Sequence, residues 1–140
     1  MSSVIIVGGG AAGLAAAGVI AMRPACIALD EPTAMLDPKG RAEIMSIIDE
    51  LHKDGITVVL ITHFMEEAVK ADRIIIMDDA KVLLDGTPEE VFEKEETLLE
   101  ANLEIPMAAM LATKLRKRGI KVPNDVITVE RLVEYVCQFK

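Results

Sequence analysis

Two carboxylates and a histidine follow apolar runs of this chain and could act on a phosphate group. Asp30 and Glu31 directly follow Cys26–Leu29, and His63 comes shortly after Ile56–Ile61. In-line attack of water on a phosphate needs a carboxylate near the water and a cation that offsets the developing charge. The alternative is structural. An acidic pair after a strand can cap a helix or form a turn, and a lone histidine is often packed and hydrogen-bonded.

A glycine-rich turn near the N-terminus favours phosphate binding by the backbone. The β-branched run Val4–Val7 precedes Gly8–Gly13, which matches the pattern G-x-G-x-x-G, and mostly helix-forming residues follow to Met22. In such a unit the glycines allow a tight turn and the close approach of a phosphate, and the helix N-terminus presents N–H groups to it. Glu31 lies about 20 residues further on, where a carboxylate would bind a ribose.

Residues 3–31 resemble the dinucleotide-binding fingerprint of flavoprotein oxidoreductases. The resemblance implies that FAD or NAD is bound by Gly8, Gly9, Gly10, Ala11, Ala12, Gly13 and Glu31. Pro24 departs from that family, which usually has glycine there. Two alternatives remain: a turn whose glycines only permit close packing, and a membrane segment in the uncharged residues 1–22. Glycines interrupt that segment, and no positively charged region precedes it.

The rest of the chain predicts alternating helices and strands. Asp37 and Pro38 are suited to start an amphipathic helix, and Gly55 is suited to end it. The further elements that we expect are a strand at 56–61, a short helix at 64–71, a hairpin of strands 74–77 and 82–84, a helix that starts with a capping box at 87–90, and helices at 106–118 and 129–139.

From about residue 18 to residue 140 the chain resembles the C-terminal half of ABC-transporter ATPases, in particular the ATP-binding subunits of energy-coupling-factor importers. Four segments carry the resemblance: Cys26–Glu31 for the Walker B strand, Met35–Asp37 for the D-loop, Ile61–His63 for the switch-histidine loop and Asp78–Gly86 for the terminal hairpin.

This resemblance implies roles for individual residues. Asp30 would hold Mg²⁺ through water, Glu31 would polarise the attacking water and His63 would sense the γ-phosphate. Asp37 would act across a dimer interface. The family's phosphate loop, G-x-x-x-x-G-K-[ST], occurs nowhere in the sequence, and Ile6–Gly10 stand where the family's Leu-Ser-Gly-Gly-Gln signature is expected. We therefore expect no ATP hydrolysis by this chain alone.

The two resemblances overlap at the glycine turn and at Asp30–Glu31. We interpret the chain as a chimera, engineered by joining a dinucleotide-binding element (1–17) to an ATPase half (18–104). The expected fold is α/β, a three-layer α/β/α domain over 1–104 with a helical extension at 105–140. The mainly parallel sheet should have the strand order 2-3-1-4-5, with an antiparallel edge hairpin. A dinucleotide fold would instead place the first two strands together, and only that adjacency would bring Glu31 to a ribose beside the glycine turn.

Composition limits the class of partner. A net charge of −8 and only 3% aromatic residues argue against a nucleic-acid partner. Two distant cysteines predict neither a disulfide framework nor a zinc site, and indicate a reduced, cytoplasmic protein. Three functions remain open: a binder of FAD, NAD or Mg-ATP, a residual ATPase, and a scaffold without ligand. Apolar surfaces predict a homodimer, with no membrane insertion and the ancestral transporter partner lost.

Overall fold

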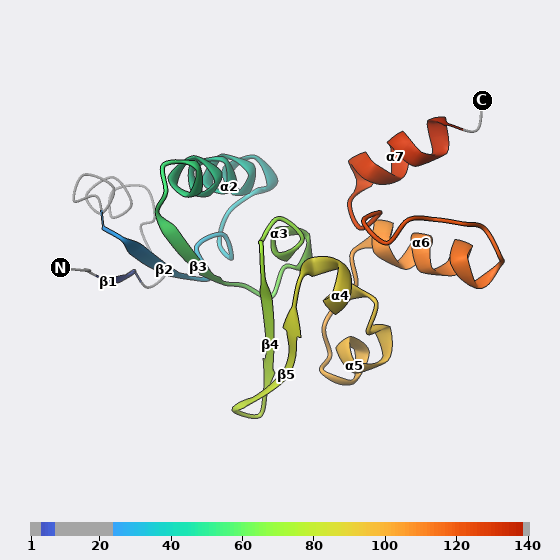
Figure 1. Ribbon diagram of the computed structural model, residues 1–140. Coiled ribbons are helices and arrows are strands. Elements are labelled where there is room, and N and C mark those ends of the chain that lie inside the picture. The colour runs from blue at the N-terminus through green and yellow to red at the C-terminus, as the bar shows by residue number, and fades with distance from the viewer. Residues whose placement is uncertain (1–3, 8–23, 139–140) are drawn as a thin grey trace. The chain divides into compact units, whose positions relative to one another are not determined.

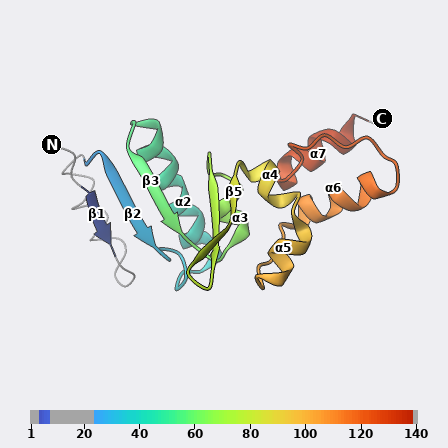
Figure 2. The same cartoon turned by 60° about the horizontal axis from the view of Figure 1, so that its bottom comes forward.

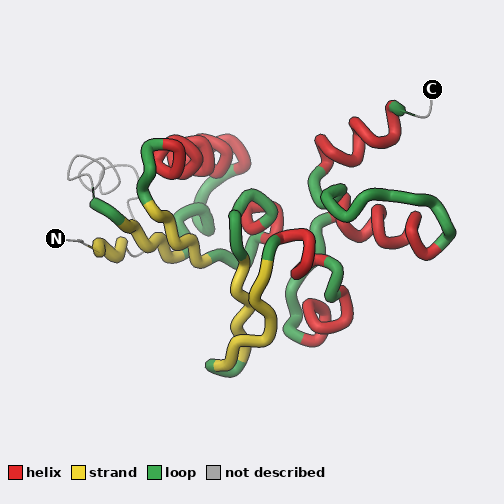
Figure 3. Tube along the Cα trace, in the orientation of Figure 1, coloured by secondary structure: helices red, strands yellow, loops and turns green. Residues whose placement is uncertain are grey.

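The computed structural model of the protein describes residues 4–7 and 24–138 (Figure 1). The chain divides into two compact units, Met1–His63 and Phe64–Lys140, which we describe separately. Strands and helices are found in both (Figure 3), so the expected mixed α/β class is confirmed. The expected boundary at residue 105 and the three-layer arrangement stay predictions.

A three-stranded parallel sheet forms the first unit. Strands β1 (Val4–Val7), β2 (Cys26–Asp30) and β3 (Thr57–Ile61) are hydrogen-bonded in the order β1-β2-β3, and Figure 2 shows them side by side. Val7 pairs with Leu29, and Asp30 pairs with Ile61. All three strands are short apolar runs, as is usual for parallel strands in α/β proteins.

The expected strand order is wrong. We predicted that Val4–Val7 would lie beside the third strand, because an empty slot there would expose apolar strand edges. Instead β1 pairs with the outer edge of β2 along its whole length, from Val4 opposite Cys26 to Val7 opposite Leu29. An uncharged apolar strand can satisfy its backbone at either open edge, so its composition did not determine the choice of partner. The hairpin strands form a sheet of their own and do not extend this one.

Helix α2 (Pro38–Lys53) packs against β3 over one face of the sheet (Figure 1). It buries Met45, Ile48 and Leu51, and Ile27 of β2 is 1% exposed. The predicted start is confirmed, because the Asp37 carboxylate accepts a 2.8 Å hydrogen bond from the Gly40 N–H. The helix ends before Gly55, whose φ of 84° suits glycine.

The second unit contains a β-hairpin and five helices among its described residues. Strands β4 (Ile74–Asp78) and β5 (Lys81–Gly86) pair antiparallel, as expected. The helices are α3 (Met65–Ala68), α4 (Pro88–Phe92), α5 (Glu95–Glu100), α6 (Met107–Lys117) and α7 (Val129–Cys137). The Thr87–Glu90 capping box of α4 is confirmed, and so is a helical C-terminal region.

One apolar core lies between the hairpin and the helices of this unit. Phe92 and Leu98 are at most 1% exposed, and they cluster with Met65, Ile74, Ile76, Val91, Ala109 and Ile127. A smaller cluster of Ala112, Val122 and Val126 joins α6 to α7. Within the described residues, no helix is long and apolar enough to cross a membrane.

Candidate functional site

Glu31 and His63 form a hydrogen-bonded pair at the carboxyl ends of adjacent strands. Glu31 follows β2, and His63 comes two residues after β3. The His63 Nδ1 atom lies 3.0 Å from Oε1 of Glu31. Because an ionised carboxylate can only accept a hydrogen bond, Nδ1 carries the proton and donates it. The two side chains are 55% and 49% exposed, so a ligand can reach both.

The backbone of Glu31 has an uncommon conformation. Its φ is 44°, in the left-handed region that non-glycine residues seldom adopt. Its N–H donates a 2.9 Å hydrogen bond to the Ile61 carbonyl, which continues the pairing of β2 with β3 by one residue. Such a conformation persists where the surroundings hold it, and it is enriched at functional sites.

The same contacts hold Glu31 on the β3 side of the sheet. Strand β2 is central, with β1 on one side and β3 on the other. The first two strands are adjacent, which is the arrangement that a dinucleotide site requires. However, the N–H and the carboxylate of Glu31 both bind groups at the end of β3, on the side opposite to β1. The structure therefore joins Glu31 to His63, while residues 8–13 lie outside the described residues.

Asp30 and Asp37 occupy different positions around this pair. Asp30 is the exposed last residue of β2. Asp37 caps α2 through Gly40, so its carboxylate has a structural role here. The described residues contain no group of three His, Cys, Asp or Glu side chains that could hold a metal ion. A protein site for Mg²⁺ needs only one or two carboxylates besides water and substrate phosphates, and Asp30 fits that requirement.

Sequence reasoning missed Thr33. This side chain is completely buried although it lies in the short loop that joins Glu31 to α2. A threonine in a loop carries no sequence signal for burial, because the residue is usually exposed.

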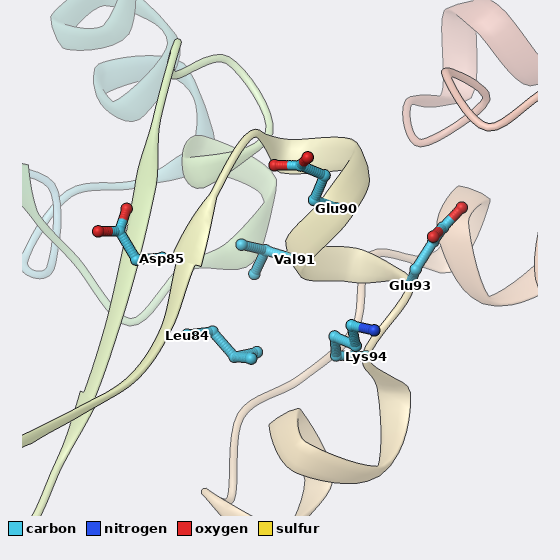
Figure 4. Close-up of a pocket in the computed structure, with 6 residues that line it drawn as sticks. All are labelled: Leu84, Asp85, Glu90, Val91, Glu93 and Lys94. Atoms are coloured by element: carbon cyan, nitrogen blue, oxygen red, sulfur yellow. The ribbon is translucent and has the colours of Figure 1, made fainter.

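A cavity of ≈ 310 Å³ lies in the second unit, and none of its lining residues is a predicted site residue (Figure 4). It is lined by Leu84, Asp85, Glu90, Val91, Glu93 and Lys94. Two of its carboxylates already have partners: Asp85 binds Arg73 through two 2.7 Å hydrogen bonds, and Glu90 accepts one from the Thr87 N–H. We assign it no role in the chemistry of Glu31 and His63.

Comparison with known proteins relates this chain to ATP-binding subunits of transporters. Residues 106–140 match the family described as the energy-coupling factor transporter EcfA1 C-terminal domain. The chain is 59% identical over 126 residues to the energy-coupling factor transporter ATP-binding protein EcfA1 of Caldanaerobacter subterraneus subsp. tengcongensis, covering 89% of this chain and 46% of that protein. The chain matches the C-terminal part of an EcfA1-type ATP-binding subunit. It spans about half the length of the curated relatives it matches.

Solved structures agree with this assignment. The structure of cbiO1 from Clostridium perfringens, part of the ABC transporter complex cbiONQ, is 39% identical with a TM-score of 0.53. It covers 71% of this chain, which in turn covers 41% of cbiO1. A dimeric ATP-binding cassette in a post-hydrolysis state, bound to ADP and phosphate, is 34% identical with a TM-score of 0.50, covering 54% of this chain and 33% of that one. The fold is therefore that of ABC ATPases.

The comparisons give no support to a chimera or to a flavin- or nicotinamide-binding segment. EcfA1 of Clostridium novyi (strain NT) is 45% identical over 137 residues, which is 97% of this chain. A match of that length includes most of residues 1–17, the segment that we attributed to a second source. The glycine-rich turn is thus part of a continuous match to one kind of protein.

Proposed function

We propose that this chain supplies the hydrolysis residues of an ATP site in an ABC-type ATP-binding subunit. The observation that carries the proposal is the Glu31–His63 hydrogen bond at the ends of β2 and β3. The relatives are ATP-binding proteins of energy-coupling factor transporters, and one similar structure contains ADP and phosphate. A carboxylate that is hydrogen-bonded to an imidazole is suited to the part of a phosphate site where the attacking water binds.

Each residue has a distinct part in this proposal. Glu31 orients and polarises the attacking water, and His63 holds that carboxylate while its ring contacts the γ-phosphate. Asp30 binds Mg²⁺ through water, and the cation offsets charge on the phosphates. The left-handed conformation of Glu31 keeps its carboxylate on the His63 side before any substrate arrives.

The proposed ATP site needs phosphate-binding groups from another polypeptide segment. The sequence has no Gly-Lys-Ser/Thr, and so lacks the lysine and the backbone N–H groups that hold the β- and γ-phosphates in P-loop proteins. The chain alone therefore binds Mg-ATP weakly and does not hydrolyse it. Glu31 is hydrogen-bonded to His63, so a site for FAD or NAD would have to be formed by residues 8–13. The calorimetric titration below tests that alternative.

Association with a second subunit follows from the same proposal. One similar structure is a dimer, and several apolar side chains are about half exposed, among them Val129, Val133 and Val136 on α7. Burial of such a stripe against another subunit removes apolar surface from water. The role of Asp37 across a dimer interface remains part of this proposal.

The test is a joined subunit, in which residues 24–140 replace the matching part of the Caldanaerobacter EcfA1. We expect Mg²⁺-dependent phosphate release that Glu31→Gln lowers by at least about 100-fold, with little change in KM. Glu43→Gln on the exposed face of α2 is the matched control and should leave the rate unchanged. A joined subunit that folds and binds ATP but keeps its rate in Glu31→Gln would contradict the proposal.

A calorimetric titration of the chain itself separates the alternatives. FAD, NAD and Mg-ATP are titrated in parallel, and again with Gly10→Val, which blocks the approach of a phosphate to the turn. Saturable binding of FAD or NAD that is lost in Gly10→Val would establish a dinucleotide site in place of the ATP site.

A further inference from the structure

The loop that leads from Glu31 into α2 has one buried residue, Thr33. Its side chain is 0% exposed, and it ranks with Ile27 among the largest fully buried side chains. No other residue from Glu31 to Asp37 is buried, and Met35 is 96% exposed. Thr33 is thus the one fully buried residue of this loop, two residues after Glu31.

Two successive turns meet at Thr33. The Ala34 N–H donates to the Glu31 carbonyl at 3.3 Å, and the Leu36 N–H donates to the Thr33 carbonyl at 3.1 Å. Asp37 then caps α2. A displacement of Thr33 must therefore be transmitted to Glu31 on one side or to the start of α2 on the other.

Glu31 requires support of this kind. Its φ of 44° is unfavourable for a side chain with a Cβ atom, so neighbouring groups must hold it there. The hydrogen bond to the Ile61 carbonyl holds its N–H side. The hydrogen bond with His63 joins two side chains that are about half exposed, and it is too weak to fix a strained backbone by itself. On its carbonyl side, Glu31 accepts the Ala34 N–H in the turn that contains Thr33.

We propose that Thr33 is a positioning residue, whose buried hydroxyl group keeps Glu31 in the left-handed conformation with its carboxylate on His63. This inference rests on the proposed function, because it names what orients the glutamate of that site. A buried hydroxyl group is stable only where it is hydrogen-bonded. Thr33→Val keeps the shape but removes the hydroxyl, whereas Thr33→Ser keeps it.

The test is NMR of the histidine side chains in the whole chain. The protein has two histidines, so a His52→Gln variant assigns the signals of His63 directly. Glu31→Ala supplies the spectrum of His63 without its carboxylate partner. We expect Thr33→Val to move the His63 Nδ1 and Hε1 signals at least halfway to the Glu31→Ala positions. Thr33→Ser should leave them near their wild-type positions.

A matched control separates positioning from general destabilisation. Ile48→Val removes one methyl group from the buried face of α2, away from the loop, and should leave the His63 signals unchanged. If Thr33→Val leaves the His63 signals at their wild-type positions, Thr33 does not position Glu31, and the inference is overturned while the pair stands. If wild type and Glu31→Ala have the same His63 signals, the pair itself is absent, and the proposed function fails as well.

Discussion

The His63 imidazole donates a 3.0 Å hydrogen bond to the Glu31 carboxylate, although the two residues are 32 positions apart in the chain. The parallel pairing of β2 with β3 brings them together, since Asp30 lies opposite Ile61. Both side chains remain about half exposed. A side-chain contact at that exposure contributes at most about 1 kcal/mol to stability, so stability alone does not explain the contact.

His63→Ala should therefore have little effect on folding. We expect the free energy of unfolding to change by less than about 1 kcal/mol, because the pair is largely solvated. Urea denaturation followed by circular dichroism measures this change. A loss of several kcal/mol would indicate that His63 is a structural residue, and would weaken its assignment to the phosphate site.

Removing the cap of α2 should lower the free energy of unfolding more than His63→Ala does. Asp37→Ala removes the carboxylate that accepts the Gly40 N–H, and should cost about 1 kcal/mol. Glu50→Ala removes the same charge from an exposed position near the end of the helix and should cost nothing. Urea denaturation of the two variants compares them directly, and equal losses would show that the cap contributes no stability.

The sequence predicted local elements well, because their signals are local. Asp37-Pro38 marks the start of α2, Gly55 follows its end, and the Thr87–Glu90 capping box starts α4. The capping box did not reveal that the helical stretch ends at Phe92 and that α5 begins at Glu95.

Two features of the site were beyond sequence reasoning. The pairing partner of β1 is a choice between strand edges of similar character, so the predicted strand order failed. The direction of Glu31 depends on the backbone of one residue and on the burial of Thr33, neither of which residue type or spacing determines. The resemblance to ABC-transporter ATPases indicated Glu31 and His63 as site residues, and the structure shows the hydrogen bond between them.

Two adjacent leucines of α5 test the packing of the apolar core in the second unit. Leu98 is completely buried, whereas Leu99 is 61% exposed. Leu98→Ala should destabilise the protein by about 2–5 kcal/mol through lost burial and an unfilled cavity. Leu99→Ala should change the free energy of unfolding by less than about 0.5 kcal/mol. Equal effects in thermal or urea unfolding would contradict the described packing.

The Arg73–Asp85 pair predicts a pH dependence in the second unit. The hydrogen bonds from Arg73 lower the pKa of Asp85 below its ordinary value of 3.8. A carboxylate with a lowered pKa in the folded state stabilises the protein above its unfolded pKa, and this stabilisation is lost as the pH falls through the folded value. Asp85→Asn should lower the Tm at pH 7, and its effect should shrink as the pH falls below 3.8.

Asp78→Asn, at the exposed end of β4, is the control for this comparison because no hydrogen bond or ion pair of its side chain is described. It should leave the Tm at pH 7 close to that of the wild type. If the loss of Tm in Asp85→Asn does not shrink as the pH is lowered from 7 to well below 3.8, the effect comes from packing and the ion pair is not its source.

The most direct test of the central claim is a double-mutant cycle on Glu31 and His63 in the joined subunit. Phosphate release in a single turnover is measured for Glu31→Gln, His63→Ala and the double variant. If the pair acts as one unit on the γ-phosphate, the double variant should be about as slow as the slower single variant. Losses that multiply, or a Glu31→Gln variant that keeps its rate, would contradict a shared role.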